Sequence, residues 1–349
     1  MTNTKAYAAF NSKEALKPHE IVRRKPGPND VQIDINYCGV CHSDIHVAHD
    51  DWNMTAYPVV PGHEIIGRVT TVGSEVTRFK AGDLVGVGCM VDSCRECNPC
   101  HNDLEQHCEQ GMVMTYGSPD AHIEGQFTHG GYSTQIVVDQ HFVLKVSEQL
   151  DTKAVAPLLC AGITTYSPLR QWQIQPGDKV GVIGLGGLGH MGVKLAAAMG
   201  ANVVMITTSP EKGADAKRLG AKEVLVSTNQ AQMEEHSGSF DFLLNTVPVA
   251  HNLDPYIPLL KLGKTMAVVG ASPIDLNSIG LVFGRKIIAG SLIGGIKETQ
   301  EMLDFCAEHN IVSDVEMINM QDINTAYERV MNNDVKYRFV IDMQSLKTG

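Results

Sequence analysis

Short apolar runs separated by turns fill the first 150 residues or so of the chain. Runs rich in β-branched residues and bounded by Gly, Pro, Asn or Asp are typical of strands. We predict strands over 31–35, 65–69, 84–87 and 136–138. Long loops lie between them, and long loops within a compact domain usually carry function. The pattern therefore predicts a β-rich first domain with functional loops.

A different pattern follows the turn Gln175-Pro176-Gly177-Asp178. Apolar, β-branched runs now alternate with helical stretches, which is typical of a doubly wound parallel sheet. The predicted strands are 179–183, 202–206, 223–226, 240–245, 265–269 and 287–289, and the predicted helices are 187–199, 211–219, 253–262 and 297–309. Because about six strands complete such a sheet, the chain should then return to the first domain. We predict an α/β protein with a β-rich domain over 1–153 and 294–349 and a nucleotide-binding domain over 154–293.

A glycine-rich loop joins the first strand of the second domain to a helix that should begin near Leu188. It reads G-x-G-x-x-G, with Gly184, Gly186, Gly187 and Gly189. Such glycines allow a tight turn and close backbone approach, while the helix N-terminus offers free N–H groups to a pyrophosphate. A glycine-rich turn without a ligand is the alternative, but the strand-to-helix setting favours a dinucleotide in a Rossmann domain.

The end of the second strand of this domain indicates which dinucleotide binds. NAD-binding domains place Asp or Glu there to hold the ribose hydroxyls. This chain has Thr207, Thr208 and Ser209 instead, followed by Lys212. Hydroxyls and a cation suit a 2′-phosphate, so the sequence predicts NADP. Capping of a helix that starts near Pro210 is another explanation for Thr208 or Ser209.

Four cysteines form a C-x2-C-x2-C-x7-C cluster in a long loop of the first domain: Cys94, Cys97, Cys100 and Cys108. Four closely spaced thiolates suit a closed, structural zinc site. The bacterial iron-sulfur spacing ends in x3 rather than x7, and disulfides belong to oxidising compartments. We therefore predict structural zinc over these two alternatives.

Composition narrows the function further. The 349 residues carry 28 Lys and Arg against 39 Asp and Glu, a formal net charge of −11. Such an acidic chain, without basic runs, is not expected to bind nucleic acid. No apolar run approaches the length of a membrane helix, and the N-terminus lacks a signal-peptide pattern. We expect a cytoplasmic protein whose nine cysteines are thiols or metal ligands.

Three further motifs carry soft metal ligands far apart in the sequence. They are Gly39-Val40-Cys41-His42-Ser43-Asp44, Pro61-Gly62-His63-Glu64 and Leu158-Leu159-Cys160-Ala161-Gly162. Spacing alone does not join them, since a lone Cys or His is often a buried packing residue. With the four-cysteine loop and the glycine loop, however, these motifs in this order resemble zinc-dependent medium-chain alcohol dehydrogenases, end to end. Thr207-Thr208-Ser209 and the ending Tyr337-Arg338-Phe339-Val340 resemble the cinnamyl alcohol dehydrogenase branch and its bacterial NADP-dependent aldehyde reductases.

The resemblance implies a GroES-like catalytic domain that carries two zinc ions. Cys41, His63 and Cys160 match the ligands of the catalytic zinc, whose fourth position stays open. Glu64 matches an acid that is either an exchange ligand during turnover or a support for the ligands. Asp44 matches the carboxylate that orients the ligand histidine.

The resemblance also implies a proton relay and further cofactor contacts. Ser43 matches the hydroxyl that takes the substrate proton, and His46 matches the outer base. The remaining family placements at the cofactor, beside the glycine loop with Leu188, are His42, Thr164, Thr246, Val269, Gly270, Ala271, Ser291, Ile293 and Lys336.

The implied activity is hydride transfer between NADP(H) and primary alcohols or aldehydes, aliphatic or aromatic, including cinnamyl-type substrates. An NAD-preferring zinc alcohol or polyol dehydrogenase is one alternative. A zinc-free quinone reductase and a non-enzymatic zinc-binding interaction module are two others. We expect a homodimer, with a tetramer as the alternative, in which edge strands near 287–290 meet.

Overall fold

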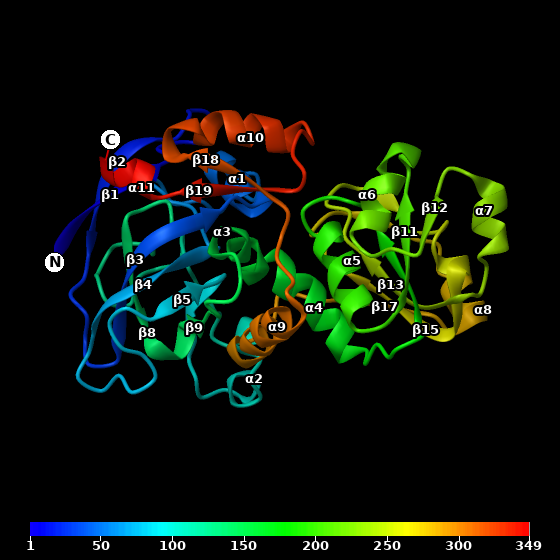
Figure 1. The fold of residues 1–349 in the computed structure, drawn as a ribbon, viewed down its shortest axis with the longest axis horizontal. Coiled ribbons are helices and arrows are strands. Elements are labelled where there is room, and N and C mark those ends of the chain that lie inside the picture. The colour runs from blue at the N-terminus through cyan, green and yellow to red at the C-terminus, as the bar shows by residue number, and fades with distance from the viewer. Residues whose placement is uncertain (349) are drawn as a thin grey trace. The chain divides into compact units, whose positions relative to one another are not determined.

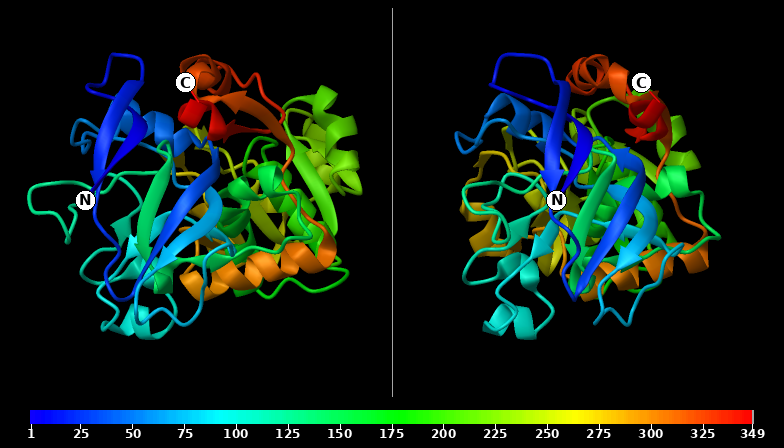
Figure 2. Two further views of the ribbon diagram at one scale, coloured as in Figure 1. Left: turned by 60° about the vertical axis from the view of Figure 1, so that its left-hand side comes forward. Right: turned by 90° about the vertical axis from the view of Figure 1, so that its left-hand side faces the viewer.

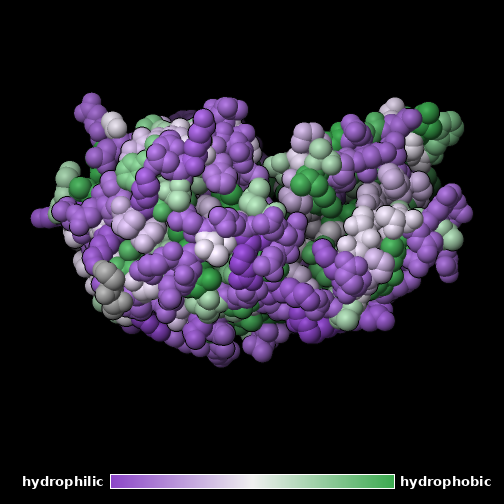
Figure 3. All heavy atoms as spheres, turned by 90° about the horizontal axis from the view of Figure 1, so that it is seen from above, coloured by the Kyte–Doolittle hydropathy of each residue, from purple (hydrophilic) through white to green (hydrophobic). Residues whose placement is uncertain are grey.

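The chain forms two compact units in the computed structural model, which describes residues 1–348 (Figure 1). The first unit runs over 1–160 and resumes at 294, and the second unit spans 161–293. Among residues 1–348, no helix is both long enough and apolar enough to cross a membrane. The face drawn in Figure 3 is mainly hydrophilic, with apolar residues scattered among the polar ones.

A mostly antiparallel sheet forms the centre of the first unit. Its order is β18-β19-β3-β4-β5-β9, and β8 also pairs with β3. The bounds are β3 (Asp30–Gly39), β4 (Ile65–Val72), β5 (Leu84–Val87), β8 (Gln135–Asp139), β9 (Leu144–Lys145), β18 (Val315–Asn319) and β19 (Arg338–Asp342). The four strands predicted from the sequence are the cores of β3, β4, β5 and β8. Ile33, Ile35 and Ile65 are fully buried in this sheet.

Two hairpins and several short helices complete the first unit. The hairpins pair β1 (Thr2–Ala8) with β2 (Lys17–Arg23), and β6 (Met90–Asp92) with β7 (Val113–Met114). The helices are α1 (His42–His49), α2 (Asn98–His101), α3 (Thr152–Val155), α9 (Ile296–His309), α10 (Ile323–Met331) and α11 (Gln344–Thr348). The C-terminal helix α11 packs against the N-terminal strand β1 (Figure 2). α9 corresponds to the predicted helix 297–309.

The second unit is built on six parallel strands in the order β12-β11-β10-β13-β15-β17. Their bounds are β10 (Lys179–Ile183), β11 (Asn202–Thr207), β12 (Glu223–Val226), β13 (Phe240–Asn245), β15 (Leu260–Val268) and β17 (Ile287–Gly290). The helices are α4 (Ala161–Gln171), α5 (Gly189–Ala198), α6 (Gly213–Arg218), α7 (Gln230–Glu235) and α8 (Ile279–Gly284), and β14 (His251–Asn252) pairs with β16 (Ile274–Asp275). This order is that of a Rossmann sheet, with the switch point between β10 and β13. The predicted α/β fold class is confirmed.

The predicted helix over 253–262 is wrong. A 3-10 turn, η5 (Ile257–Leu259), contains Pro258, and strand β15 already begins at Leu260. Pro258 cannot donate a helical hydrogen bond, and Leu260 pairs with Phe240 across a bulge instead. The predicted helix 211–219 is likewise divided into a 3-10 turn, η4 (Pro210–Lys212), and α6.

Candidate metal and cofactor sites

Four side chains from distant segments of the first unit converge on one point. Cys41 immediately precedes α1, His63 and Glu64 precede β4, and Cys160 follows a 3-10 helix, η3 (Ala156–Leu159). Their ligand atoms all lie within 4.8 Å of one another, and the Cys41 and Cys160 Sγ atoms are 3.9 Å apart. Two thiols and an imidazole are the donors that zinc prefers. The fold therefore brings together the ligands that sequence spacing alone did not join.

The Asp44 carboxylate connects the segments that supply these ligands. Its Oδ2 accepts the Cys41 backbone N–H at 2.8 Å, and its Oδ1 accepts the Gly62 backbone N–H at 3.0 Å. The same Oδ1 lies 3.1 Å from Nδ1 of His63. Because a carboxylate only accepts, the imidazole proton belongs on Nδ1, which leaves Nε2 available to a metal. Asp44 is fully buried and holds both segments.

Glu64 lies in the same cluster with one oxygen paired and one free of partners. Its Oε1 forms an ion pair with Arg338, which also donates to the Val40 carbonyl at 2.9 Å from Nη2. Its Oε2 is buried without a hydrogen-bond partner, and burial raises the pKa of this carboxyl to about 7. Burying an oxygen without a hydrogen-bond partner is energetically unfavourable, and a bound cation would supply the missing partner. Arg338 is 274 residues from Glu64 in the sequence. No local sequence pattern indicated a role for it in this site.

The two relay candidates lie on α1 next to this cluster. The Ser43 Oγ is 3.8 Å from the Cys41 Sγ, and the His46 Nδ1 is 2.7 Å from the Asp51 Oδ2. Asp51 was not identified from the sequence, where it is one of two adjacent acids after the helix. Since Asp51 accepts from Nδ1, the His46 Nε2 is left as a proton acceptor. Burial lowers the pKa of the neighbouring His42.

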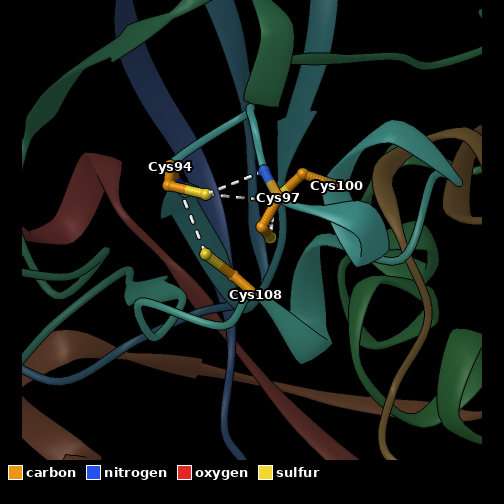
Figure 4. Close-up of side chains that lie close together, drawn as sticks. All are labelled: Cys94, Cys97, Cys100 and Cys108. Carbon is orange, nitrogen blue, oxygen red and sulfur yellow. Dashed lines mark hydrogen bonds between the residues drawn. The ribbon is translucent and has the colours of Figure 1, made fainter.

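The four-cysteine loop forms a second compact group of sulfur atoms (Figure 4). The Cys97 and Cys100 Sγ atoms are 3.4 Å apart, and those of Cys94 and Cys100 are 3.9 Å apart. Tetrahedral zinc with bonds of about 2.3 Å would separate its sulfurs by about 3.8 Å. The Cys94 N–H also points to the Cys108 Sγ at 3.4 Å. All nine cysteines of the chain are free thiols, so the structure does not support disulfides as the explanation for this cluster.

Glu105 fastens the end of the four-cysteine loop to α9. It lies in a 3-10 helix, η1 (Glu105–His107), just before Cys108. Its Oε2 accepts the Ile296 backbone N–H at 3.1 Å, and its Oε1 is 3.2 Å from the His141 Nε2. Burial alone would raise the pKa of this carboxyl, but the hydrogen bonds from His141 and from backbone N–H groups outweigh burial and lower it.

We expect Glu105→Ala to lower the free energy of unfolding by about 1–3 kcal/mol, because buried donors then lose their acceptor. A lowered pKa in the folded state means that this contribution is present above the unfolded pKa and is lost as pH falls through the folded one. The gap in melting temperature between wild type and variant should therefore narrow in acid. Thermal melts at pH 7 and pH 4 measure it, with exposed Glu109→Ala as the control. A gap that widens in acid would contradict this role.

The glycine loop of the second unit fits a close-lying ligand. Gly184 has φ +92°, a conformation that favours glycine, and a Cβ on Gly189 would lie 1.9 Å from the Gly184 carbonyl oxygen. A Cβ on Gly186 would meet nothing within 4 Å, so this glycine leaves open space beside the backbone. The Thr246 Oγ1 donates to the Ile183 carbonyl at 2.8 Å and so ties the end of β13 to the loop. The loop is therefore closely packed at Gly184 and Gly189, whereas Gly186 leaves room for a ligand beside the backbone.

The other cofactor candidates of this unit gather at one edge of its sheet. Thr207, Thr246, Val269–Ala271, Ser291 and Ile293 stand at or shortly after the carboxyl ends of β11, β13, β15 and β17. In a doubly wound sheet, this edge at the switch point is where dinucleotides bind. Thr164 belongs to α4 of the same unit, whereas His42 and Lys336 belong to the first unit.

The hydroxyls after β11 are not helix caps. Ser209 occupies the N-cap position of η4, but no side-chain capping hydrogen bond is present there. The Thr207 Oγ1 accepts the Ser209 backbone N–H at 3.1 Å, and Thr208 is exposed. The helix-capping explanation is therefore not supported, and the Thr208 and Ser209 hydroxyls are free to meet a ligand.

Comparisons with known proteins agree with this arrangement. Residues 27–148 match the alcohol dehydrogenase GroES-like domain, and residues 187–308 match the zinc-binding dehydrogenase domain. The chain is 58% identical to aldehyde reductase YahK of Escherichia coli (strain K12), over 98% of this chain and 99% of that protein. It is 52% identical to NADP-dependent alcohol dehydrogenase C 1 of Mycolicibacterium smegmatis (strain ATCC 700084 / mc(2)155), over all of both chains. A solved structure of a cinnamyl alcohol dehydrogenase from Sorghum bicolor superposes with a TM-score of 0.95 at 45% identity, covering 98% of each chain. The chain therefore belongs to the zinc-dependent medium-chain alcohol dehydrogenases, in their cinnamyl alcohol dehydrogenase-like branch.

Proposed function

We propose that this protein is an NADP-dependent zinc alcohol dehydrogenase that works as an aldehyde reductase. Its substrates are primary aldehydes and alcohols of aliphatic or aromatic, cinnamyl-type structure. The observation that carries the proposal is the convergence of Cys41, His63 and Cys160 around one point, with His63 held by Asp44. Relatives named aldehyde reductase and NADP-dependent alcohol dehydrogenase support the reaction class.

The donor sets fit one zinc ion in each of the two clusters. Cys41, His63 and Cys160 would hold the catalytic ion, and Glu64 offers its unpartnered Oε2 as an exchange ligand. An ion held by these residues would supply a Lewis acid for the oxygen of the substrate. Cys94, Cys97, Cys100 and Cys108 would hold the structural ion, and four thiolates leave no position for a substrate.

Ser43 and His46 of α1 accept and return the proton of the substrate hydroxyl. When an alcohol is oxidised, the Ser43 Oγ accepts the proton of the substrate hydroxyl as it gives up its own, and the His46 Nε2 is the final proton acceptor on this chain. Asp51, 2.7 Å from Nδ1, keeps the His46 ring in the tautomer that this step requires. When an aldehyde is reduced, the same groups return the proton in the opposite direction.

The second unit binds the cofactor, which supplies or accepts the hydride. Gly184–Gly189 would hold the pyrophosphate, and Thr207, Thr208, Ser209 and Lys212 would receive the 2′-phosphate. The candidates for the nicotinamide are Thr164, Thr246, Val269, Gly270, Ala271, Ser291 and Ile293, and His42 and Lys336 are the cofactor candidates among the residues of the first unit.

Thr207→Asp should shift cofactor preference from NADPH toward NADH. A carboxylate at the end of β11 repels the 2′-phosphate and accepts hydrogen bonds from the ribose hydroxyls of NADH. We expect the ratio of kcat/KM for NADPH to that for NADH to fall at least about tenfold, since like charges brought together cost several kcal/mol. Steady-state kinetics with both cofactors measure the ratio, and Thr207→Ser, which keeps the hydroxyl, is the matched control. An unchanged ratio would remove this strand end from the phosphate site.

The decisive experiment is NADPH oxidation with a panel of aliphatic, benzylic and cinnamyl aldehydes, beside metal analysis of the same preparation. The proposal expects turnover and two zinc ions per chain. Faster oxidation of polyols with NAD than of primary alcohols with NADP would favour a polyol dehydrogenase. Two zinc ions without any change in NADPH fluorescence would favour a non-enzymatic zinc-binding module, and absence of the catalytic zinc would favour a quinone reductase.

We also propose a cytoplasmic homodimer that forms through the second unit. Three neighbouring apolar side chains of α8 and β17 are largely exposed: Val282 at 71%, Phe283 at 86% and Ile287 at 48%. β17 is also an edge strand of the parallel sheet. Exposed apolar groups beside an unpaired strand edge favour association with a second copy.

Phe283→Asp should convert this dimer to a monomer, because the interface would have to bury a charge. Size-exclusion chromatography with light scattering measures the mass. Phe10→Asp, which changes a phenylalanine 40% exposed in the first unit, is the control and should leave the mass unchanged. A dimer that survives Phe283→Asp, or a tetramer, would point to another interface.

A further inference from the structure

Two buried tyrosines extend the hydrogen bonding of Asp44 away from the ligand cluster. The Tyr132 hydroxyl lies 3.4 Å from the Asp44 Oδ2, and the Tyr327 hydroxyl lies 3.4 Å from the Tyr132 hydroxyl. Tyr132 follows the Gly130–Gly131 turn and is fully buried, and Tyr327 belongs to α10 and is 4% exposed. Both contacts join side chains and are not part of the backbone hydrogen bonding of a strand or a helix.

The direction of each hydrogen bond follows from the chemistry of the groups. The Asp44 carboxylate only accepts, so the Tyr132 hydroxyl must donate to it, and its oxygen then accepts from the Tyr327 hydroxyl. Burial and the Asp44 charge raise the pKa of both phenols well above their ordinary value, so they remain donors. The bonds therefore run in series from Tyr327 through Tyr132 to Asp44.

Together with the contacts described above, these hydrogen bonds fix the orientation of the Asp44 carboxylate. The Cys41 and Tyr132 donors meet Oδ2, while the Gly62 and His63 donors meet Oδ1. A carboxylate held on both oxygens cannot rotate about its Cβ–Cγ bond without breaking buried hydrogen bonds, and a buried donor left without an acceptor is unfavourable. The orientation of the His63 ring depends on that fixed carboxylate.

We propose that Tyr132 and Tyr327 are positioning residues for the catalytic metal. Through Asp44, the Tyr327–Tyr132 chain fixes the His63 ring and sets how slowly the Cys41–His63–Cys160 site releases zinc. This inference rests on the proposed function, because it requires that these three residues bind zinc. It assigns to α10, in the C-terminal part of the chain, a role at a site whose ligands all precede residue 161.

Hydroxyl deletions separate this role from simple packing. Tyr132→Phe removes the donor to Asp44 directly, whereas Tyr327→Phe leaves every contact of Asp44 intact and removes only the outer link. We expect Tyr132→Phe to speed zinc release about 10–100-fold, the range typical of lost support to a metal ligand, and Tyr327→Phe to have a smaller effect. The double variant should release zinc no faster than Tyr132→Phe alone, because the bonds act in series.

The test uses the zinc-loaded full-length protein and follows transfer of zinc to 4-(2-pyridylazo)resorcinol. Cobalt substituted into the protein reports on the ligand geometry through its d–d spectrum. The control is Tyr57→Phe, whose hydroxyl donates to the Ala48 carbonyl of α1 at 2.9 Å without contacting Asp44. Melting temperatures of all variants show whether a change follows general stability.

Faster release from one of the two zinc ions in Tyr132→Phe, with an altered cobalt spectrum and a Tyr57→Phe variant like wild type, supports the inference. Release rates in Tyr132→Phe and Tyr327→Phe that equal those of Tyr57→Phe would overturn it. So would a double variant whose effects simply add. A wild-type protein that holds zinc at the four cysteines alone would instead refute the proposed function.

Discussion

Cys160→Ala is expected to leave one zinc ion per chain instead of two and to reduce kcat/KM with NADPH and an aldehyde by more than a hundredfold. Loss of a mere supporting partner costs about 10–100-fold in metal affinity or activity, so loss of a ligand should exceed that range. The Cys160 Sγ is 3.9 Å from the Cys41 Sγ, so its removal takes one ligand from this cluster. The variant leaves all four cysteines of the other cluster unchanged. Metal analysis and steady-state kinetics on one preparation measure both effects.

The matched control for this variant is Cys306→Ala. Cys306 is also a buried thiol of the first unit, but it contacts the Met302 sulfur at 3.6 Å on α9, far in sequence from the ligand segments. Its replacement should leave both zinc ions and the turnover in place. A Cys160→Ala protein with two zinc ions and wild-type turnover would show that the catalytic site lies elsewhere.

Cys100→Ala should damage stability before it damages catalysis. Binding energy of a structural zinc is folding energy, so losing the ion releases the loop over 94–108 and, through Glu105, its attachment to α9. A loss of only a few kcal/mol would lower the melting temperature by at least about 5 °C. Protein that remains folded should keep its turnover, since a zinc held by four thiolates has no open position for a substrate.

Thermal melts, zinc content and active-site-normalised kinetics test this division between the two metal sites. His101→Ala changes the neighbouring exposed residue on α2 and should behave like wild type. A Cys100→Ala protein that is folded and stable but inactive would overturn the division.

Local sequence patterns predicted the parts of this protein that depend on neighbours in the chain. The strands 179–183, 223–226 and 240–245 agree with β10, β12 and β13 because β-branched, buried runs have few other structures available. The four cysteines lie within one loop, so their spacing alone indicated a metal. The region 253–262 failed because pairing of Leu260 with Phe240 outweighed its apparent helical pattern.

Long-range contacts could not be read from local patterns. Cys41, His63 and Cys160 were grouped only through the family resemblance, since nothing in their own segments links them. The partners of Glu64 and of His46, Arg338 and Asp51, carry no distinctive spacing. A charged residue looks the same in sequence whether or not it meets a site, so only the fold distinguishes the two cases.

The position of β19 has a consequence for how the protein is made. This strand lies between β18 and β3 and brings Arg338 to Glu64, so residues 37–39 pair with residues 340–342. All of 161–293 is synthesised before them. The central sheet of the first unit therefore cannot close until residues 338–342 have been synthesised, and Glu64 has no buried counter-charge before then.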